Sequence, residues 1–359
     1  MHISSLKIEH FRGVRSLEVD GLARVNLLLG KNNVGKTTVL EAVFLVSGVG
    51  NPRRSEVVDK LRGLYHESGD DFRFLFYGLD TQEPFKLAAS YSLNDRYAVP
   101  AGQSQISVLG EPVLSDVDDP LYGGGELGEP IEGVRLHVSL QEPGFVGEAD
   151  AFIRRTRGSK SARVNVSPRL KEFNRSVFVQ TAPDIRELSK RLEWLTVNKR
   201  TGRLIEVLQG LDHRIQDISL GSEGRIYLDI GLPTLLPLNL MGDGVRRLVN
   251  IVTTVSNSQG GIVLIDEIDN GLHYTALSLL WRAILVAAEA FSVQVIATTH
   301  SREALEHLTG LLEEPEMRTH GDAVRAFDLV RGDDNRVRAY RYDAEQLDFA
   351  LDHDLDVRS

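Results

Sequence analysis

Apolar residues form strand-like runs and one helical repeat in the first fifty positions. Two strand-like stretches, 5–10 and 15–19, precede a short apolar run over 25–29. Apolar residues at positions 39, 42, 43 and 46 then recur at helical spacing, which predicts a helix from Lys36 to about Ser47. The pattern therefore predicts a strand, a loop beginning at Gly30, and a helix in direct succession.

The last third of the chain alternates apolar runs with helical repeats. The predicted elements are helices over 245–255, 273–290 and 302–311, and strands over 261–266 and 293–298. Ser301 is a suitable N-cap for the last of these helices. Strands that alternate with helices are typical of a parallel sheet with crossover helices, so this region predicts an α/β fold.

The middle of the chain is less regular. Residues 72–93 and 105–109 have strand-like patterns, which predict a β-rich lobe beside the loop. Helical repeats near 183–195 and 202–211 lack the sustained heptads of a long coiled coil. We therefore interpret residues 112–235 as an α/β insertion arm.

The composition is that of a globular protein, with 42% hydrophobic residues among 359. The absence of cysteine excludes disulfides, thiol nucleophiles and cysteine-ligated metal sites. The N-terminus does not place a long apolar run after a basic cap, and the apolar stretch 277–299 is interrupted by Arg282 and Glu289. We therefore expect a cytoplasmic protein with no signal peptide and no membrane span.

The net charge of −10 argues against a surface that binds nucleic acid nonspecifically. The segment 154–175 is nevertheless rich in Arg and Lys, with Glu172 as its single acid. Two interpretations are open: a solvated turn beside a strand, or a local patch for DNA phosphates. Residues 116–133, rich in glycine, proline and acids, predict a mobile loop.

The loop after the first apolar run reads GKNNVGKT. Its two glycines let the backbone fold tightly, so that N–H groups face a polyphosphate at the positive end of the following helix. Lys36 would reach the β and γ phosphates of ATP, Thr37 would ligate Mg²⁺, and Thr38 would support the α phosphate. The predicted ATP-binding residues of the loop are Gly30, Lys31, Asn32, Asn33, Gly35, Lys36, Thr37 and Thr38.

Three further polar residues follow apolar strands. Asp266 would be delivered beside the metal ion, where a carboxylate can hold Mg²⁺ or its water, and Glu267 would accept a proton from the attacking water. His300 ends the next strand, where a neutral imidazole could bond the γ phosphate. The predicted catalytic residues are Glu267, Lys36 and His300, and the predicted metal ligands are Thr37 and Asp266.

A glycine-rich turn opens a helix before the acid-ended strand. Gly242, Asp243 and Gly244 could present backbone N–H groups to phosphate, or could simply begin a helix. The order of phosphate loop, glycine turn, acid-ended strand and strand-end histidine resembles the ABC-type ATPases, and within them the OLD-like branch related to RecF and SMC heads. The matching stretches are LKIEHFRGV, VNLLLGKNNVGKTTVLEAV, LMGDGVRRL, IVLIDEIDNGLHY and IATTHS.

The resemblance implies a P-loop ATPase fold of ABC type, with a mixed or parallel sheet, helices, a β-rich lobe and an insertion arm. The expected divisions are 1–111 and 236–342 for the two parts of the ATPase domain, 112–235 for the arm, and 343–359 for a peripheral acidic tail. The resemblance also implies that Arg12, in the Phe-Arg-Gly opening, contacts the nucleotide. It makes Gln82 a candidate for the glutamine that senses metal and water.

ABC-type heads hold ATP between the phosphate loop of one subunit and the signature of another. Because this chain carries one copy of each, the resemblance implies a homodimer or a larger even assembly. Met241–Gly242–Asp243–Gly244–Val245 replaces the Leu-Ser-Gly-Gly-Gln signature of membrane transporters. This difference favours an OLD-like ATPase over a transporter subunit.

OLD proteins carry a Toprim-type nuclease after the ATPase, and too few residues follow His300 to form one. We therefore expect a stand-alone OLD-like ATPase whose ATP-dependent closure controls a separately encoded effector. Such ATPases serve in anti-phage systems of the Septu and PARIS kinds. The alternative is a RecF-like clamp that binds DNA in recombination or repair.

Overall fold

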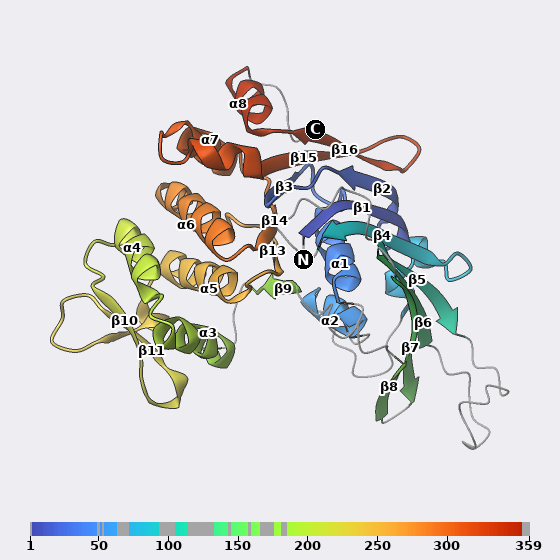
Figure 1. Cartoon of the computed structure of the whole chain (residues 1–359), viewed down its shortest axis with the longest axis horizontal. Helices are drawn as coiled ribbons and strands as arrows, with labels where there is room; N and C mark the ends of the chain where they lie inside the picture. The colour runs from blue at the N-terminus through green and yellow to red at the C-terminus, as the bar shows by residue number, and fades with distance from the viewer. Residues whose placement is uncertain are drawn as a thin grey trace.

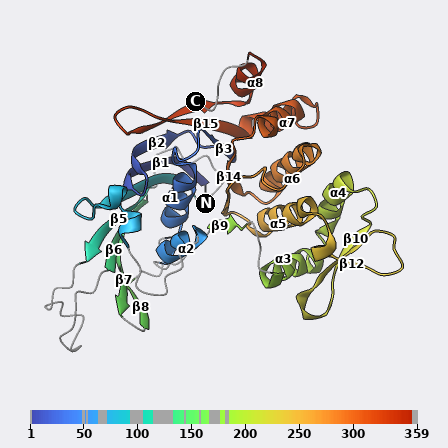
Figure 2. The same ribbon diagram turned by 180° about the vertical axis from the view of Figure 1, so that it is seen from behind.

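The computed structural model consists of two large sheets with a buried helix between them and a layer of helices on the outside (Figures 1 and 2). The residues that the structure describes are 2–48, 51, 54–62, 72–92, 105–113, 133–142, 145–156, 159–165, 176–180 and 185–353. The predicted loop at 116–133 lies outside them except for Gly133. Of the basic segment 154–175, residues 154–156 and 159–165 are described, as strands.

A six-stranded sheet forms the centre of the molecule, in the order β16-β15-β3-β14-β13-β9. Its strands are β3 (Val25–Leu29), β9 (Ser176–Val179), β13 (Ile262–Ile265), β14 (Gln294–Thr298), β15 (Val324–Arg331) and β16 (Val337–Tyr342). All neighbours pair in parallel except β15 and β16. The predicted strands at 25–29, 261–266 and 293–298 are therefore confirmed, and they lie side by side.

The two faces of the central sheet belong to two different hydrophobic cores. Successive side chains of a strand point to opposite faces, so Leu27 and Leu29 enter one core while Leu28 enters the other. All three side chains are fully buried. A strand covered on both faces needs apolar residues at every position, which explains the continuous apolar run that the sequence shows there.

An antiparallel sheet of seven strands packs beside the central one, in the order β2-β1-β4-β5-β6-β7-β8. Its strands are β1 (His2–Phe11), β2 (Val14–Asp20), β4 (Phe85–Ser92), β5 (Gln105–Val113), β6 (Gly133–Glu142), β7 (Phe145–Thr156) and β8 (Ser159–Asn165). The predicted β-rich lobe is confirmed, with one correction. Residues 72–79, expected as strand, form the short 3-10 helices η1 (Phe72–Leu75) and η2 (Tyr77–Leu79).

Helix α1 (Lys36–Val46) follows the glycine loop and lies between the two sheets (Figure 1). Every residue from Thr38 to Val46 is buried. The helix predicted from apolar residues at helical spacing is confirmed, and because it is enclosed on all sides it is apolar nearly all round. The acid among the buried residues of α1 is Glu41, which is 1% exposed.

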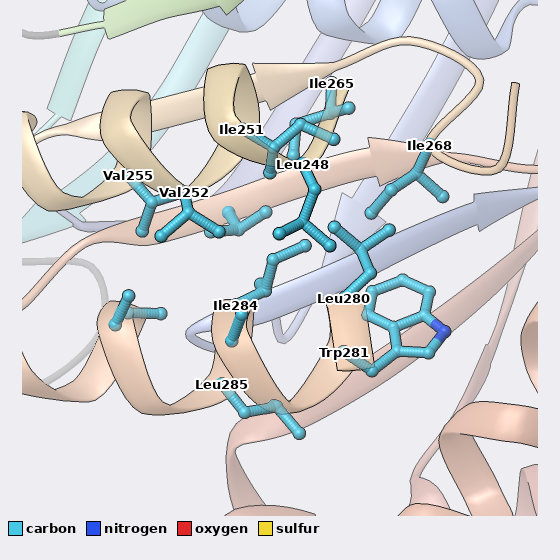
Figure 3. Close-up of a cluster of buried hydrophobic side chains, with 14 of the residues drawn as sticks. Leu248, Ile251, Val252, Val255, Ile265, Ile268, Leu280, Trp281, Ile284 and Leu285 are labelled. Atoms are coloured by element: carbon cyan, nitrogen blue, oxygen red, sulfur yellow. The ribbon is translucent and has the colours of Figure 1, made fainter. Parts of the chain in front are cut away.

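The opposite face of the central sheet is covered by α5 (Asp243–Asn257), α6 (Leu277–Ala290) and α7 (Arg302–Glu313). Figure 3 shows part of the core between them, in which Leu248 of α5 and Ile284 of α6 are both fully buried. Trp281 donates its indole N–H to the carbonyl oxygen of Ala304 at 2.8 Å, which joins α6 to α7. Ser301 accepts a hydrogen bond from the backbone N–H of Ala304, as its predicted role as N-cap requires.

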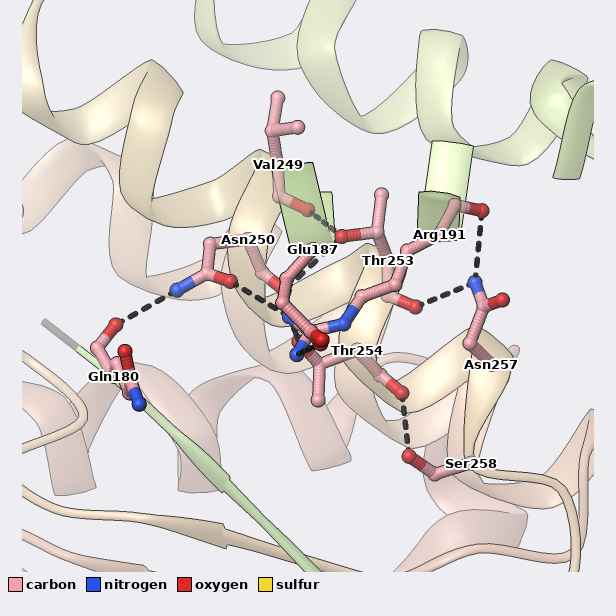
Figure 4. A network of polar contacts seen from close by, with 9 residues as sticks. All are labelled: Gln180, Glu187, Arg191, Val249, Asn250, Thr253, Thr254, Asn257 and Ser258. Atoms are coloured by element: carbon pink, nitrogen blue, oxygen red, sulfur yellow. Dashed lines mark hydrogen bonds and ion pairs between the residues drawn. The ribbon is translucent and has the colours of Figure 1, made fainter. Parts of the chain in front are cut away.

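An outer pair of helices, α3 (Ile185–Val197) and α4 (Thr201–Leu211), packs on α5 and α6. Arg191 of α3 donates to Asn250 Oδ1 at 3.2 Å and to Thr254 Oγ1 at 2.8 Å, both on α5. Figure 4 shows this network, in which Asn250 also donates to the carbonyl oxygen of Gln180 at 2.8 Å. The contacts tie the outer helices to the sheet through α5.

The segment 112–235, interpreted above as an appended arm, is distributed over three parts of the fold. Strands β6 to β8 extend the antiparallel sheet, β9 forms an edge of the central sheet, and α3 and α4 contribute to the main core. A small sheet of β10 (Asp217–Leu220), β11 (Ile226–Asp229) and β12 (Leu236–Pro237) follows α4. The described part of this segment packs with the rest of the domain, and its assignment as an insertion stays a prediction.

The expected peripheral tail is also integrated where the structure describes it. Asp343 forms a capping box with Gln346 at the start of α8 (Ala344–Asp352). Leu347 and Leu351 of this helix are buried in the core beside α7. The remaining short elements are α2 (Arg54–Leu61), η4 (Ser222–Gly224), η5 (Leu238–Leu240), η6 (Tyr274–Ala276) and η7 (Arg318–Ala323).

No helix within the described residues is both long enough and apolar enough to cross a membrane.

Candidate functional site

A cavity of 660 Å³ opens at the ends of β3, β13 and β14, where α1 begins. The predicted site residues that line it are Arg12, Asn32, Asn33, Gly35, Lys36, Thr37, Thr38, Asp266, Glu267 and His300. Parallel strands end at the same edge of a sheet, and ligands of open α/β sheets bind outside that edge. The fold therefore brings three segments that are far apart in the sequence to one cavity.

The glycine loop takes backbone conformations that side chains rarely adopt. Gly30 has a φ of 121° and Gly35 a φ of 123°. A Cβ atom at Gly30 would lie 2.5 Å from the carbonyl oxygen of Leu329, and one at Gly35 would lie 2.8 Å from Cγ2 of Val14. Both positions therefore require glycine, for the conformation and for the space.

Lys36 folds back over the loop. Its Nζ donates to the carbonyl oxygen of Gly30 at 2.6 Å and to that of Lys31 at 3.0 Å. Burial lowers the pKa of Lys36, while the nearby carboxylates of Asp266, Glu267 and Asp328 act to raise it. Asp328 is 2% exposed on β15 and was missed by sequence reasoning, because nothing local marks a carboxylate that approaches from a neighbouring strand.

Arg331 connects the glycine loop to the turn between β1 and β2. Nη2 of Arg331 donates to the carbonyl oxygens of Gly13 at 2.9 Å, Val34 at 3.2 Å and Asn33 at 3.4 Å. One cation thus holds two segments that both line the cavity. No sequence signal pointed to Arg331, which follows the loop by about three hundred positions.

Both carboxylate oxygens of Asp266 accept hydrogen bonds from threonine hydroxyls. Thr37 Oγ1 donates to Oδ2 at 2.9 Å, and Thr298 Oγ1 donates to Oδ1 at 2.6 Å. The two residues predicted as metal ligands are therefore adjacent. They offer the hard oxygen atoms that Mg²⁺ prefers, and that ion commonly takes only one or two protein ligands beside phosphate and water. Thr298 was not predicted.

Glu267 follows Asp266 in a left-handed backbone conformation with a φ of 47°. Its backbone N–H donates to Thr298 Oγ1 at 2.8 Å, and its carboxylate accepts from Asn270 Nδ2 at 3.2 Å. A non-glycine residue in this region stores local strain and is over-represented at active sites. The carboxylate remains exposed and lines the cavity.

Two arginines share the buried carboxylate of Glu41 in the cavity wall. Arg12 Nε lies 3.0 Å from Glu41 Oε2, and Arg62 Nε lies 2.7 Å from Glu41 Oε1. Arg12 and Arg62 both line the cavity, and guanidinium groups suit the recognition of a polyphosphate. Arg12 was predicted from the resemblance; Glu41 and Arg62 were missed, since their pairing joins α1 to a residue beyond α2.

The structure does not bring every predicted residue to the cavity. Gly242, Asp243 and Gly244 begin α5 and do not line it. Gln82 is exposed in the turn before β4 and does not line it either. Gly30 and Lys31 contribute the carbonyl oxygens that hold Lys36.

Protein-family models match two separate stretches of the chain. Residues 1–97 match a model described as "AAA ATPase domain". Residues 140–306 match a model described as "AAA domain, putative AbiEii toxin, Type IV TA system". The matches include the glycine loop, the glycine turn, the acid-ended strand and His300.

Relatives and solved structures agree with these models. An ATP/GTP phosphatase of Helicobacter pylori is 23% identical over 376 residues, covering 98% of this chain and 98% of that protein. The DNA replication and repair protein RecF of Heliobacterium modesticaldum is 43% identical over 53 residues, 15% of this chain and 14% of that protein. The crystal structure of an SMC head bound to the C-winged helix domain of ScpA superposes with a TM-score of 0.50 at 13% identity, covering 96% of this chain and 98% of that one.

The chain is therefore similar to AAA ATPase domains over these two stretches and to RecF over a short segment, and it has the fold of the SMC head. The predictions of an ATPase and of an ABC-type P-loop fold are confirmed. The assignment to the OLD-like branch stays a prediction, and so do the roles of the individual site residues.

Proposed function

We propose that this ATPase binds Mg²⁺-ATP in the cavity and uses closure around the nucleotide to control a separate partner. The observation that carries the proposal is the convergence of Lys36, Thr37 and Asp266 in one cavity, with Thr37 and Asp266 joined by a 2.9 Å hydrogen bond. Lys36 and Thr37 follow β3 and Asp266 follows β13, so two segments far apart in the sequence meet at one edge of the sheet.

The chemistry that the residues can perform is hydrolysis of the γ phosphate. Lys36 would turn from its carbonyl partners to the β and γ phosphates, and Thr37 and Asp266 would hold Mg²⁺, which neutralises the phosphate charge when it is bound. Glu267 would take a proton from water as the water oxygen bonds to phosphorus and the bond to the β–γ bridging oxygen breaks. ADP and phosphate are the products, and His300 would bond the γ phosphate before cleavage.

The second half of the proposal is that two copies build the site. Gly242, Asp243 and Gly244 lie outside the cavity of their own chain, and they are wholly or partly exposed. Helix α5 begins there, so its positive end can face a phosphate that another copy holds. We therefore propose a homodimer, or a larger even assembly, that closes when ATP is bound.

We predict that ATP raises the mass of the particle in solution. One chain weighs 39.9 kDa, and mass photometry of the protein with a slowly hydrolysed ATP analogue should show a shift towards pairs of chains. Gly242→Arg is a sharp test, because a Cβ atom built at Gly242 meets no other described atom within 4 Å and the position is exposed. This variant should fold and bind ATP but should not pair, since the new side chain occupies the place of the second copy's nucleotide.

Wild-type protein that hydrolyses ATP while every particle contains one chain would contradict the paired site. Lys36→Ala provides the control, because a variant that does not hold ATP should keep its ATP-free mass.

We further propose that the partner is an effector in an anti-phage defence or DNA-transaction complex. The description of the model that matches residues 140–306 mentions a toxin–antitoxin system, which supports a defence role. The alternative is a RecF-like clamp for DNA, which the short matches to RecF support.

The two candidates predict different responses to DNA. If an effector is the partner, duplex or single-stranded DNA should change the rate of hydrolysis by less than about twofold, even at low salt where phosphate contacts are strongest. A RecF-like clamp should bind DNA and hydrolyse ATP faster in its presence. Phosphate release with and without DNA, in buffers of low and physiological salt, separates them.

A further inference from the structure

Arg247, in the first turns of α5, is a buried cation to which the proposed function assigns no role. Its side chain is 6% exposed. Nη2 donates to two consecutive carbonyl oxygens, that of Asp266 at 3.1 Å and that of Glu267 at 3.2 Å. Nε and Nη1 have no hydrogen-bond partner among the residues that the structure describes.

This arrangement is costly for a residue that merely packs. Burial lowers the pKa of Arg247, and only the partial attraction of Asp266, Asp269 and Glu267 opposes that effect. Unsatisfied buried donors are few in native proteins and often accompany a functional constraint. If this position only had to be filled, an apolar side chain of similar size would make the folded protein more stable than arginine does.

The two carbonyl oxygens belong to the strained part of the cavity. Glu267 has the left-handed φ of 47°, and its backbone is held at the N–H by Thr298 and at the carbonyl oxygen by Arg247. Such a conformation persists only when its surroundings determine it from several sides. The backbone N–H of Asn270 also donates to the Glu267 carbonyl oxygen at 3.0 Å, and the Asn270 side chain bonds the carboxylate. Arg247 is therefore the one charged group among these contacts that hold the Glu267 backbone.

Arg247 also belongs to the helix that the glycine turn begins. Gly242 to Gly244 form the start of α5, and Arg247 lies within one helical turn of Gly244 in the same rigid segment. A shift of the turn must therefore move the guanidinium that holds the Glu267 backbone. In Figure 1, α5 lies next to the edge of the central sheet formed by β9 and β13, the strand that leads to Asp266 and Glu267.

We infer that Arg247 is a positioning residue that transmits the state of the glycine turn to Glu267 of the same chain. This inference rests on the proposed function, in which the turn contacts nucleotide held by a second copy. Nucleotide bound by one copy would then orient the proton acceptor in the other copy's cavity. The two cavities of a pair would be coupled through the two Arg247 side chains.

The test is a double-mutant cycle on the rate of hydrolysis at saturating ATP. Gly242→Ala changes the turn without a steric clash, and Arg247→Ala removes the hydrogen bonds between α5 and the carbonyl oxygens of Asp266 and Glu267. Each single variant should lower kcat about tenfold or more, with KM changed by less than about twofold. The double variant should be no slower than Arg247→Ala alone. Once Arg247 is removed, a change in the turn can no longer alter the position of Glu267, so it should not lower kcat further.

Arg191→Ala is the matched control. It removes another arginine that is largely buried against α5, through bonds to Asn250 and Thr254 on the far part of the helix. This variant should lower the melting temperature but leave kcat near the wild-type value, and its effect should add to that of Gly242→Ala. Arg247→Lys, which keeps one charged donor, should recover part of the rate and replaces Arg247→Ala in the cycle if the latter does not fold.

Additive losses in Gly242→Ala and Arg247→Ala would overturn the inference, and so would a Gly242→Ala variant with the wild-type rate. Loss of activity in Arg191→Ala equal to that in Arg247→Ala would show that α5 matters only as a support. Each of these results is distinct from failure of the proposed function, which would appear as full hydrolysis in Lys36→Ala.

Discussion

Lys36→Ala is expected to lose ATP binding and hydrolysis together. Lys36 is the one lysine that lines the described cavity, and its ammonium now bonds two carbonyl oxygens that a nucleotide would replace. Charge-assisted hydrogen bonds to phosphate contribute about 1.5–3 kcal/mol each, so losing them should weaken ATP about a hundredfold or more. Titration calorimetry measures the binding, and phosphate release measures the rate.

Lys190→Ala controls for the loss of a lysine. Lys190 is exposed on α3, far from the cavity in sequence and not part of its lining. It should leave both measurements unchanged. Lys36→Ala with wild-type affinity and rate would remove the basis of the proposed site, because no other lysine of the described lining could replace it.

Glu267→Gln is expected to bind ATP but to hydrolyse it about 10²–10⁴ times more slowly. The amide keeps the size of the side chain and can still accept the hydrogen bond from Asn270 Nδ2, so the left-handed backbone and the cavity should be preserved. It cannot take a proton from water, and turnover should fail at that step. The same variant should accumulate as an ATP-bound pair of chains.

The measurements for Glu267→Gln are single-turnover phosphate release, ATP affinity and particle mass. Glu193→Gln, an exposed position on α3, should behave as wild type in all three. If Glu267→Gln hydrolyses ATP at the wild-type rate, the proton acceptor is another group. If the variant loses ATP binding as well, Glu267 supports the structure of the cavity and does not act on water.

The sequence alone determined the local elements of the ATPase. Strand, glycine loop and helix over residues 25–46 follow from apolar spacing and from two positions where only glycine fits, Gly30 and Gly35. The strand that ends at Asp266 and the N-cap Ser301 were equally readable. These features could be predicted because each depends on residues within about one helical turn or one strand of each other.

Only the tertiary structure decided how distant segments meet. β9, from the segment 112–235, joins the edge of the central sheet beside β13, and residues 72–79 form short helices where strand was expected. The contacts that shape the site join residues that are twenty or more positions apart in the sequence. They are the ion pairs of Arg12 and Arg62 with Glu41, the bonds of Arg331 to the glycine loop, and the bond of Arg247 to the Glu267 carbonyl oxygen. Periodicity reports only which face of an element is buried. Strand pairing and ion pairs depend on which buried faces come together, and that is settled by packing the whole chain.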